Sequence, residues 1–452
     1  MGGVRANGAD TGQSSPGLRD VFRNRTFAVL YSAETQSIAG DQLARVALSV
    51  LVFQQTGSAA ATAATYAATY LPAVLGGWVL GRLGDRYPRR AVMVGCDLAR
   101  AALFAAMTIP GLPLAAVIAF LIGAVFLGPA FSASQVSYLS TVLDKASFRV
   151  ATGLRMVTGQ AAQVAGFAVG GVLVAVLHPH GALLVDAATY LISAVAVGAL
   201  RSAPPSRAGA CRAPDGAEAA SVAAPRRSLR RDGQLWAMAG LSVLAGFFVV
   251  PEGLAVPFGA RTGATTVQIG LLLAALPLGG ALGAALLVHV VPPARRLAAA
   301  RWMAIGCGLP LLVPAFVHHW SAAMVCWLVS GVLGAYQVEI VTSLVHRIPD
   351  ASRSRILGIL SASLLGAQGL GVLAFGLVAR LVPVATTIAI AGLAGSCLAL
   401  VLGLWLRSLT AGPATPSSGG RHYPRRDDVV GPLYRPRHSA LAFEEPVEAA
   451  GR

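Results

Sequence analysis

Long apolar runs are the feature of this chain that most restricts its fold. A membrane-spanning helix needs about 20 mostly apolar residues, because it rises about 1.5 Å per residue through a hydrocarbon core about 30 Å thick. The sequence contains twelve such runs, at 27–53, 58–80, 91–109, 114–143, 153–177, 181–200, 235–260, 268–291, 298–317, 321–345, 355–379 and 382–406. We therefore predict an all-α membrane protein with twelve transmembrane helices.

Composition argues against a soluble fold. Hydrophobic residues make up 55% of the 452 residues and charged residues 12%, whereas a soluble globular chain usually has about 25% charged residues. The first 26 residues are polar and Gly-rich, with no apolar core before a cleavage site, so we do not expect a cleaved secretory signal. The first spanning helix is then expected to direct membrane insertion.

The basic charge of the chain follows the positive-inside rule of membrane topology. The formal net charge is +16, which could also indicate nucleic-acid binding. The basic residues, however, lie in alternate loops, as is typical of cytoplasmic loops. They include Arg19, Arg23, Arg25, Lys145, Arg149, Arg226, Arg227, Arg230, Arg231, Arg295, Arg296, Arg347, Arg353 and Arg355. We expect a multi-pass plasma-membrane protein with both termini in the cytoplasm and no nucleic-acid partner.

The apolar runs fall into two groups of six. Residues 201–234 between them are rich in Ala, Pro, Ser and Arg, which predicts a flexible cytoplasmic linker. The predicted organisation is a cytoplasmic segment at 1–26, six-helix bundles at 27–200 and 235–406, and a disordered cytoplasmic tail at 407–452. An offset of 205 residues aligns Pro72 with Pro277 and Gln163 with Gln368. Duplication explains this register, and chance matches in Gly/Ala-rich sequence are the alternative.

The segment from Gly81 to Arg90 places four arginines and an aspartate between the second and third apolar runs. Charged groups are excluded from hydrocarbon, so this segment must lie at a membrane surface. Gly81 permits close helix approach, Asp85 can cap a helix N-terminus, and the arginines can bind carboxylates or lipid phosphates. The spacing Gly-x-x-x-Asp-Arg-x-x-Arg-Arg resembles the signature loop of the major facilitator superfamily of transporters, with Pro88 where the common pattern has glycine.

That resemblance implies the major facilitator fold, in which two pseudo-symmetric six-helix bundles surround a substrate path. It also implies that the loop acts as a latch, which holds the cytoplasmic side shut in one state. The second half has Val290 at the position of Asp85, so we expect asymmetric gating. The candidate residues of this cytoplasmic gate are Gly81, Asp85, Arg86, Arg89, Arg90, Asp97 and Arg100.

Four further segments are similar to the drug- and siderophore-exporter branch, which includes macrolide efflux and enterobactin exporter proteins. They are 40–48, 70–72, 96–101 and 184–191. The resemblance implies export of a small hydrophobic or amphipathic compound, such as a drug, an antibiotic or a siderophore-like natural product, by alternating access and proton antiport. Gly166 to Gly171 resembles the Gly-Pro-x-x-Gly-Gly antiporter motif, but Phe167 replaces its proline, which weakens the antiport implication of that motif.

Charged residues inside the spans are functional candidates, because each costs several kcal/mol in hydrocarbon. Glu34, Asp41 and Arg45 share one face of the first span. Asp41 is either a carboxylate whose charge switches with conformation or the partner of Arg45 in a self-neutralising pair. Asp97 and Arg100 in the third span are expected to form a structural or gating pair. The candidates for proton coupling are Asp41, Glu34, Arg45, Glu252 and Glu339, and Glu252 stands between Pro251 and Gly253 at a plausible outer gate.

Neutral polar residues in the spans suggest a substrate cavity. Tyr and Gln offer stacking and hydrogen bonds without fixed charge, which suits a bulky amphipathic ligand. Hydrogen bonding between neighbouring spans is the alternative role for such residues. The candidates are Tyr66, Tyr70, Gln160, Gln163, Asp186, Tyr190 and Gln368.

No other chemistry is indicated by motif. The five cysteines show no metal-ligand or disulfide spacing, and no GxxxxGK[ST] sequence for binding ATP occurs. We therefore expect neither enzymatic activity nor a metal or other cofactor, and a proton gradient as the energy source. The expected partners are a small-molecule substrate and the lipid bilayer, and the expected state is a monomer. A lysolipid or lipid flippase of the same fold and a non-transporting membrane sensor are the alternative functions.

Overall fold

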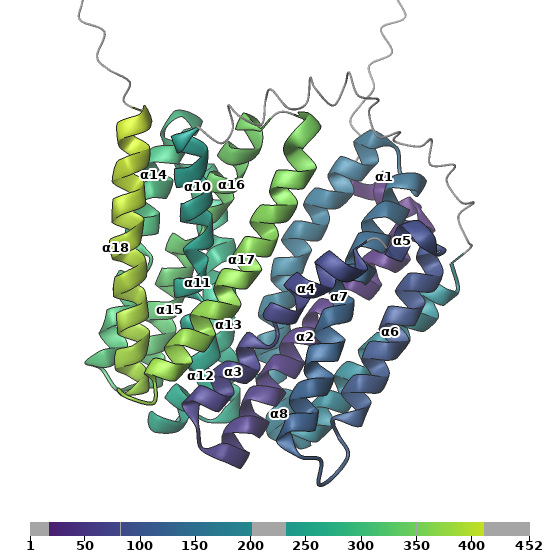
Figure 1. The fold of residues 1–452 in the computed structure, drawn as a ribbon, viewed down its shortest axis with the longest axis horizontal. Coiled ribbons are helices and arrows are strands. Elements are labelled where there is room, and N and C mark those ends of the chain that lie inside the picture. Colours follow the sequence, from purple (N-terminus) through teal and green to yellow (C-terminus); the bar gives the residue numbers. More distant parts are fainter. Residues whose placement is uncertain (1–17, 82, 201–231, 349, 411–452) are drawn as a thin grey trace, which may run out of the picture. The chain divides into compact units, whose positions relative to one another are not determined.

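A computed structural model describes residues 18–81, 83–200, 232–348 and 350–410, all of which belong to one compact unit. Within these ranges the regular elements are helices and no strand occurs (Figure 1). Most of the predicted N-terminal segment, nearly all of the predicted linker and the tail beyond Thr410 lie outside the described residues.

The first half of the chain forms the predicted spans one to six. Its helices are α1 (Leu18–Arg23), α2 (Arg25–Thr56), α3 (Ala59–Ala67), α4 (Leu71–Leu80), α5 (Leu83–Arg86), α6 (Arg89–Ala106), α7 (Leu114–Val142) and α8 (Lys145–Gly198). The predicted spans at 153–177 and 181–200 both lie in α8, which has a non-helical backbone at His178 (φ 60°, ψ 167°). Pro179 follows, and proline disfavours helical geometry in the residue before it. This kink separates the fifth span from the sixth.

The second half forms the predicted spans seven to twelve. Its helices are α10 (Gly233–Val243), α11 (Ala245–Phe248), α12 (Val250–Arg261), α13 (Thr266–Val290), α14 (Pro293–Gly306), the 3-10 helix η1 (Leu309–Ala315), α15 (Trp320–Gly334), α16 (Tyr336–Arg347), α17 (Asp350–Val378) and α18 (Val384–Thr410). Spans seven, nine and ten are therefore each built from more than one helical piece.

Eight helices among the described residues are long and apolar enough to cross a membrane. One of them, Ala146–Gly198, has 53 residues and contains both the fifth and the sixth span. The first and third spans, α2 and α6, carry charged residues in their interiors, and the second span is divided into the short helices α3 and α4. With these, the described chain provides the twelve crossings that the sequence predicts.

Polar caps fix where several helices begin. The Asn24 side chain accepts hydrogen bonds from the backbone N–H groups of Thr26 and Phe27 at the start of α2. Asp144 does the same for α8, and hydrogen bonds from the Ser147 side chain and backbone lower the pKa of Asp144. Thr265 and Gln268 form a capping box at the start of α13. Such caps satisfy N–H groups that the first helical turn leaves without partners.

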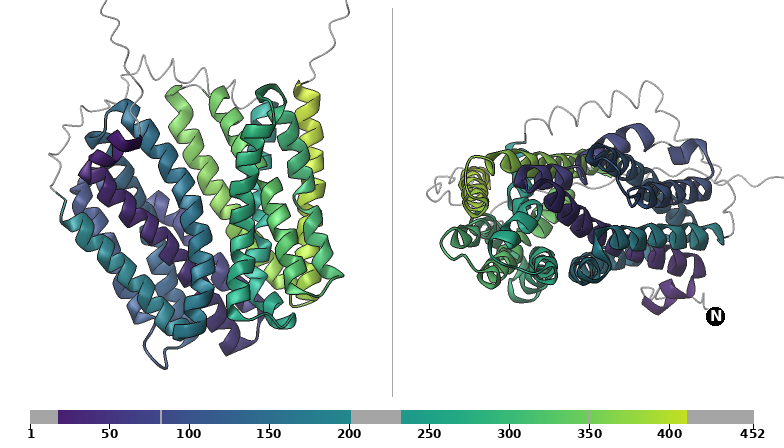
Figure 2. Two further views of the ribbon diagram at one scale, coloured as in Figure 1. Left: turned by 180° about the vertical axis from the view of Figure 1, so that it is seen from behind. Right: turned by 90° about the horizontal axis from the view of Figure 1, so that it is seen from below.

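The two halves lie side by side (Figure 2). We call the end that carries α5 and the first residues of α6 and α8 the basic end, and the other, where α2 leads into α3, the opposite end. Near the basic end each half has a core of its own, around Phe27 and Met93 in the first half and around Met238 and Leu344 in the second. A third core extends across both halves.

Glycines bring the halves together nearer the opposite end. A Cβ atom on Gly171 of α8 would lie 2.8 Å from the Cα of Gly270 in α13. A Cβ atom on Gly376 of α17 would lie 2.4 Å from the Cβ of Ala63 in α3. These distances are too short for added side chains, so the backbones of α8 and α13 are in direct contact and the backbone of α17 packs on the Ala63 side chain. The structure is thus closed between the halves at the opposite end.

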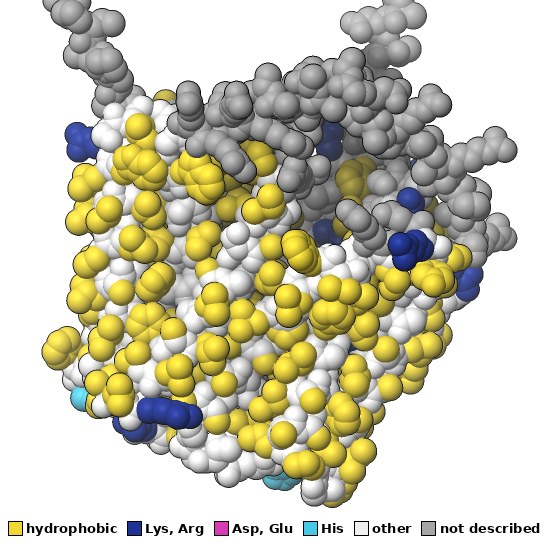
Figure 3. Space-filling model, in the orientation of Figure 1, with side chains coloured by type: hydrophobic (Ala, Val, Ile, Leu, Met, Phe, Trp, Pro, Cys, Tyr) yellow, Lys and Arg dark blue, Asp and Glu magenta, His cyan; other side chains and the backbone are white. Residues whose placement is uncertain are grey.

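The outer surface is apolar, as expected for helices in a lipid bilayer. Figure 3 shows hydrophobic side chains spread over one face, with Lys and Arg toward its upper part and its lower edge. Large apolar side chains are strongly exposed on helices far apart in the sequence. Trp78 is 92% exposed and Met156 is 72% exposed. Packing against lipid, rather than water, accounts for this surface.

We expect Gly171→Ala to lower the melting temperature of the purified protein by several degrees. The added methyl group would collide with the backbone of Gly270, and such overpacking costs about 1–3 kcal/mol. Differential scanning fluorimetry in detergent measures the effect. Gly153→Ala, also in α8, is the matched control, because a Cβ atom there meets nothing within 4 Å. Equal melting temperatures for the two variants would contradict the close contact between the halves.

Candidate functional site

A central cavity of about 470 Å³ lies between the two halves. This volume is in the range of about 300–1,000 Å³ that is common for small-molecule sites. The first half contributes Arg45, Tyr70, Gln160 and Gln163 to its wall. The residues from the second half include Phe248, Glu252, Pro277, Cys307, Ser330, Tyr336, Gln337, Leu365 and Gln368. The cavity is therefore lined by aromatic and amide side chains together with one cation and one carboxyl group.

A second cavity of about 390 Å³ adjoins the first. Arg45, Tyr70 and Leu365 line both cavities, so the two meet at these side chains. The remaining wall of this side cavity is formed by Asp41, Ala44, Leu48, Thr69, Ala73, Arg100, Phe104, Leu121, Val125, Gly128, Pro129 and Ser132. It is more apolar than the central cavity, and its charged groups come from α2 and α6.

Helix breaks place several of these side chains. The second span is interrupted between Ala67 and Leu71, so that Tyr70 stands at the break. The seventh span is interrupted at Val249, and Glu252 lies in the first turn of α12. The tenth span is interrupted at Ala335, directly before Tyr336. Irregular backbone at membrane depth is tolerated where it lines a cavity, and these three breaks do so.

Arg45 is held by tyrosines. Its Nη1 donates a hydrogen bond to the Tyr70 hydroxyl at 3.3 Å. Its guanidinium carbon lies 4.7 Å from the centroid of the Tyr70 ring and 5.7 Å from that of the Tyr66 ring. Neither ion pair found among the described residues includes Arg45. The hypothesis that Asp41 is neutralised by Arg45 is therefore wrong for this conformation.

Asp41 pairs instead with Arg100. The Nη2 atom of Arg100 lies 3.1 Å from Asp41 Oδ1, and the Tyr190 hydroxyl donates to the same oxygen. The Arg100 guanidinium also stacks 4.1 Å from the centroid of the Tyr190 ring, which in turn stacks on Phe104. The pair joins α2 to α6, and Tyr190 links both to α8. Arg100 is thus an interior residue of the side cavity.

The expected pair of Asp97 with Arg100 is not formed. The Oδ2 atom of Asp97 accepts a hydrogen bond from Ser193 Oγ of α8 at 2.6 Å. The short Asp97 side chain reaches the Ser193 hydroxyl of the neighbouring α8 as its hydrogen-bond donor, while the longer Arg100 side chain reaches Asp41 of α2. Sequence spacing within α6 could not show either partner, and the role of Ser193 was missed.

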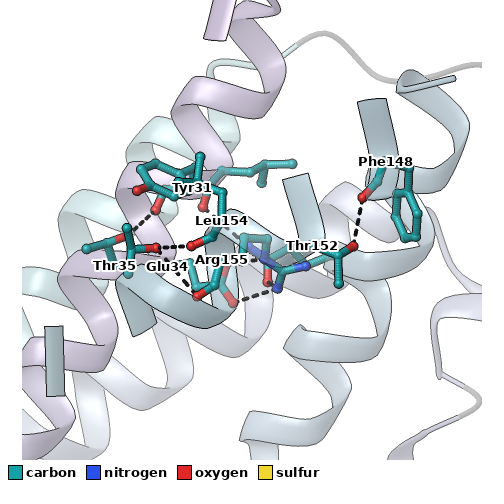
Figure 4. Close-up of polar contacts among 10 residues, drawn as sticks. Tyr31, Glu34, Thr35, Phe148, Thr152, Leu154 and Arg155 are labelled. Carbon is teal, nitrogen blue, oxygen red and sulfur yellow. Dashed lines mark hydrogen bonds and ion pairs between the residues drawn. The ribbon is translucent and has the colours of Figure 1, made fainter. Parts of the chain in front are cut away.

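Glu34 belongs to a separate cluster nearer the basic end. Its Oε2 atom lies 2.5 Å from Nε of Arg155 in α8. Gln135 of α7 donates to Glu34 at 3.3 Å and accepts from Arg155 at 3.1 Å. Figure 4 shows Glu34 and Arg155 facing each other between their helices. Arg155 is not among the residues predicted from the sequence, although an arginine in a predicted span was a visible signal.

Three of the expected cavity residues lie behind the cavity walls. Asp186 and Tyr190 are fully buried, and Tyr66 is 1% exposed. Tyr66 donates a hydrogen bond to Glu252 Oε2 at 2.7 Å, which links α3 of the first half to α12 of the second. Tyr70, Gln160, Gln163 and Gln368 do lie in the walls. Their contact with a substrate stays a prediction.

The other coupling candidate, Glu339, has a local partner. It accepts a hydrogen bond at 3.1 Å from Ser343, one turn further along α16. It is not among the residues that line the two cavities. Glu252, by contrast, is 8% exposed and lies in the wall of the central cavity. A search of the described residues finds no cluster of His, Cys, Asp and Glu that could hold a metal ion.

The predicted gate loop contacts the first half. Arg89 donates to the carbonyl of Ser137 in α7 at 2.9 Å, and Arg90 donates to the carbonyl of Gly198 at the end of α8. A Cβ atom on Gly81 would meet the carbonyl of Gly77, which belongs to its own helix, rather than a neighbouring helix. Arg86 is exposed, and the side chain of Asp85 lies outside what the structure describes. The latch role stays a prediction.

Comparison with known proteins gives consistent matches. A family model described as Major Facilitator Superfamily matches residues 30–334. The multidrug efflux pump Tap of Mycobacterium tuberculosis is 28% identical over 382 residues, which cover 79% of this chain and 88% of Tap. Tap of Mycobacterium bovis has the same identity and coverage.

Solved structures share the fold. A bacterial homolog of the human lysosomal transporter Spinster superposes with a TM-score of 0.64 at 14% identity, covering 86% of this chain and 97% of that one. A D-xylose-proton symporter also gives 0.64, at 15% identity, covering 84% of this chain and 96% of its own. At these identities the likeness concerns the fold alone.

Arg100→Gln should destabilise the protein more than Arg45→Gln. Loss of Arg100 leaves the Asp41 carboxylate without its cation, and breaking a buried pair costs about 3–5 kcal/mol. Because the Asp41 side chain is 33% exposed, the cost should lie at or below the lower end of that range. Arg45→Gln removes no ion pair that the structure describes. Thermal unfolding in detergent compares the two variants.

The double variant Asp41→Asn, Arg100→Gln is the control for this pairing. Removal of both charges should recover part of the stability that Arg100→Gln alone loses. If the stability losses of the single variants Asp41→Asn and Arg100→Gln add up to the loss of the double variant, Asp41 and Arg100 do not act as a pair.

Proposed function

Because this chain belongs to the Major Facilitator Superfamily, we propose that it exports small hydrophobic or amphipathic compounds in exchange for protons. One observation carries this proposal above the others. Two adjoining cavities lie in a molecule that is closed between its halves at the opposite end, and a carboxylate paired with arginine lines one of them. The similarity to a protein named as a multidrug efflux pump supports the same function.

The cavity walls suit an amphipathic substrate. Phe248, Tyr70 and Tyr336 offer aromatic faces in the central cavity, and four glutamines offer hydrogen bonds in either direction. The side cavity offers mainly aliphatic and aromatic contacts. An apolar part of a ligand can occupy the side cavity while its polar part meets the glutamines. Such a division of contacts tolerates substrates of varied structure.

Asp41 is well placed to couple transport to proton movement. It lines the side cavity, so both a proton and a ligand can reach it from there. Protonation of Asp41 would remove the charge that holds Arg100 and so weaken the link between α2 and α6. One proton that moves inward across 100 mV contributes about 2.3 kcal/mol, enough for modest accumulation against a gradient.

Alternating access requires that the contacts that close the two halves at the opposite end, which we call the seal, come apart. The close contacts of Gly171 with Gly270 and of Ala63 with Gly376 must separate, and the Tyr66–Glu252 hydrogen bond must break. We assign the basic end to the cytoplasm, because arginine-rich loops are retained on that side. The protein would then lie in the plasma membrane with both termini in the cytoplasm, and the present conformation would load substrate from the cytoplasm.

Asp41→Asn should abolish transport driven by a pH gradient, and its expression level is measured alongside. The amide cannot exchange a proton, so a gradient can no longer be used. Everted vesicles are tested with ethidium, Nile red and anilinonaphthalene sulfonate as cationic, neutral and anionic probes, and with a fluorescent lysolipid. Asp144→Asn is the matched control, because asparagine caps a helix as well as aspartate does and Asp144 lies outside both cavities.

Coupled transport that persists in Asp41→Asn would exclude Asp41 as the coupling residue. Movement of the lysolipid alone by the unsubstituted protein would favour the flippase alternative. Failure to move any of the four probes faster than vesicles without the protein would count against export of amphipathic compounds.

Tyr66→Phe should increase leakage of an accepted probe several-fold in the absence of a gradient. The variant loses the hydrogen bond between Tyr66 and Glu252, which crosses the seal between the halves. Loss of such a hydrogen bond costs about 0.5–1.5 kcal/mol, and this cost falls only on the closed form of the seal. Efflux from preloaded vesicles measures the leak, with Tyr31→Phe as control, since Tyr31 lies in α2 near the basic end. An unchanged leak would show that this hydrogen bond does not stabilise the closed seal.

A further inference from the structure

Asp186 is a fully buried carboxyl group with an incomplete set of hydrogen bonds. It lies in the sixth span, in the part of α8 that follows the kink, and its exposed fraction is 0%. Its Oδ1 atom accepts from the Thr189 hydroxyl at 3.2 Å. Its Oδ2 atom has no hydrogen-bond partner among the described residues. Buried carboxylates are normally paired or fully hydrogen-bonded, so the state of Asp186 needs an explanation.

The backbone of α2 is shaped to admit this carboxyl group. A Cβ atom on Gly40 would lie 2.2 Å from Asp186 Oδ1 and 2.7 Å from Thr189 Oγ1. Only glycine leaves room for Asp186 at this position, which is directly before Asp41. Gln36, one turn earlier on α2, donates to the backbone carbonyl of Thr189 at 3.5 Å. The first span therefore packs closely on the helical turn that carries Asp186.

The charges around Asp186 do not balance if every carboxyl group is ionised. The titratable groups that interact electrostatically with it are Asp41 from α2, Arg100 from α6 and Tyr190 from α8, and Asp97 of α6 interacts in turn with Arg100 and Asp41. Arg100 is the single cation of this group and interacts electrostatically with all three aspartates. Its ion pair goes to Asp41, and Asp97 has the Ser193 hydroxyl. Neither ion pair among the described residues includes Asp186.

A neutral Asp186 fits these observations better than an ionised one. An isolated buried carboxylate is strongly unfavourable, and such groups normally take up a proton instead. A bound metal ion is the other common way to neutralise a set of carboxylates. The described part of the chain, however, contains no group of three such ligands placed to hold one.

We propose that Asp186 carries a proton in this conformation and is the internal proton site of the transporter, with Asp41 as its exchange partner at the cavity. In the transfer step, the O–H bond of Asp186 breaks and the proton passes to the carboxylate of Asp41. Arg100 then loses its pairing with Asp41 and neutralises the new Asp186 carboxylate. Asp41 releases the proton to water in the side cavity and recovers its negative charge. The role in coupling rests on the proposed function, whereas the protonation of Asp186 does not.

The arrangement makes proton release responsive to the cavity. Asp41 and Arg100 both line the side cavity, while Asp186 lies behind them. A ligand that draws Arg100 away from Asp41 would raise the proton affinity of Asp41 and so favour transfer of the proton from Asp186 to Asp41. Binding in the side cavity thus acts on the charge balance that holds the proton.

Infrared spectroscopy of the purified protein at neutral pH tests the protonation directly. A protonated carboxyl group gives a carbonyl band apart from those of carboxylates. We expect a band of one carboxyl group that Asp186→Asn removes and that Asp144→Asn retains. Asparagine is close in size and uncharged, so Asp186→Asn should fold, and its melting temperature checks this. A spectrum in which Asp186→Asn leaves the protonated band unchanged would overturn the proposal.

Transport by the same variants tests the coupling role separately. The test uses a probe that the unsubstituted protein transports. Asp186→Asn should still bind this probe, but the acceleration of its transport by a pH gradient should fall at least tenfold. If the band is lost while acceleration remains, Asp186 is protonated but is not the coupling site. If no probe is moved by the unsubstituted protein, the proposed function fails while the infrared result stands.

Discussion

The ion pair between Asp41 and Arg100 is the interaction on which the interior of the first half depends. It joins α2 to α6, and the Tyr190 hydroxyl brings α8 to the same carboxylate oxygen. Three helices therefore meet at one atom. Since Asp41 and Arg100 also line the side cavity, a change in the charge of the pair acts both on helix packing and on the cavity wall. Helix packing and the wall of the side cavity are coupled through this one contact.

Hydrophobic length predicted the helices well, because lipid demands long apolar runs. The runs predicted at 114–143 and 268–291 correspond to α7 (Leu114–Val142) and α13 (Thr266–Val290). The breaks were less predictable. The apolar run continues through Ala335, where the tenth span is interrupted, and the break between Ala67 and Leu71 likewise lies inside one run. Hydropathy reports burial in lipid, whereas a break depends on which backbone groups a cavity can satisfy.

The site was only partly predictable, because spacing along a helix gives a face but not a partner. Asp41 and Arg45 are four residues apart, yet Arg45 packs on tyrosines and Asp41 pairs with Arg100, 59 residues away in the sequence. Buried charge identified Asp41 and Glu252 as residues of interest. The space that Gly40 leaves for Asp186 follows from the approach of two helices, and no local pattern encodes that approach.

The distribution of the cores makes the two ends of the molecule unequal. At the basic end each half keeps its own core, so separation there exposes little additional apolar surface. The third core crosses from one half to the other, with Val46 and Phe167 on one side and Leu254 and Leu272 on the other. Separating the two halves at this core would expose apolar surface, at a free-energy cost of about 25 cal/mol per Å² of surface that water reaches. We therefore expect the protein to rest closed at the opposite end, because leaving that state exposes the core that the two halves share.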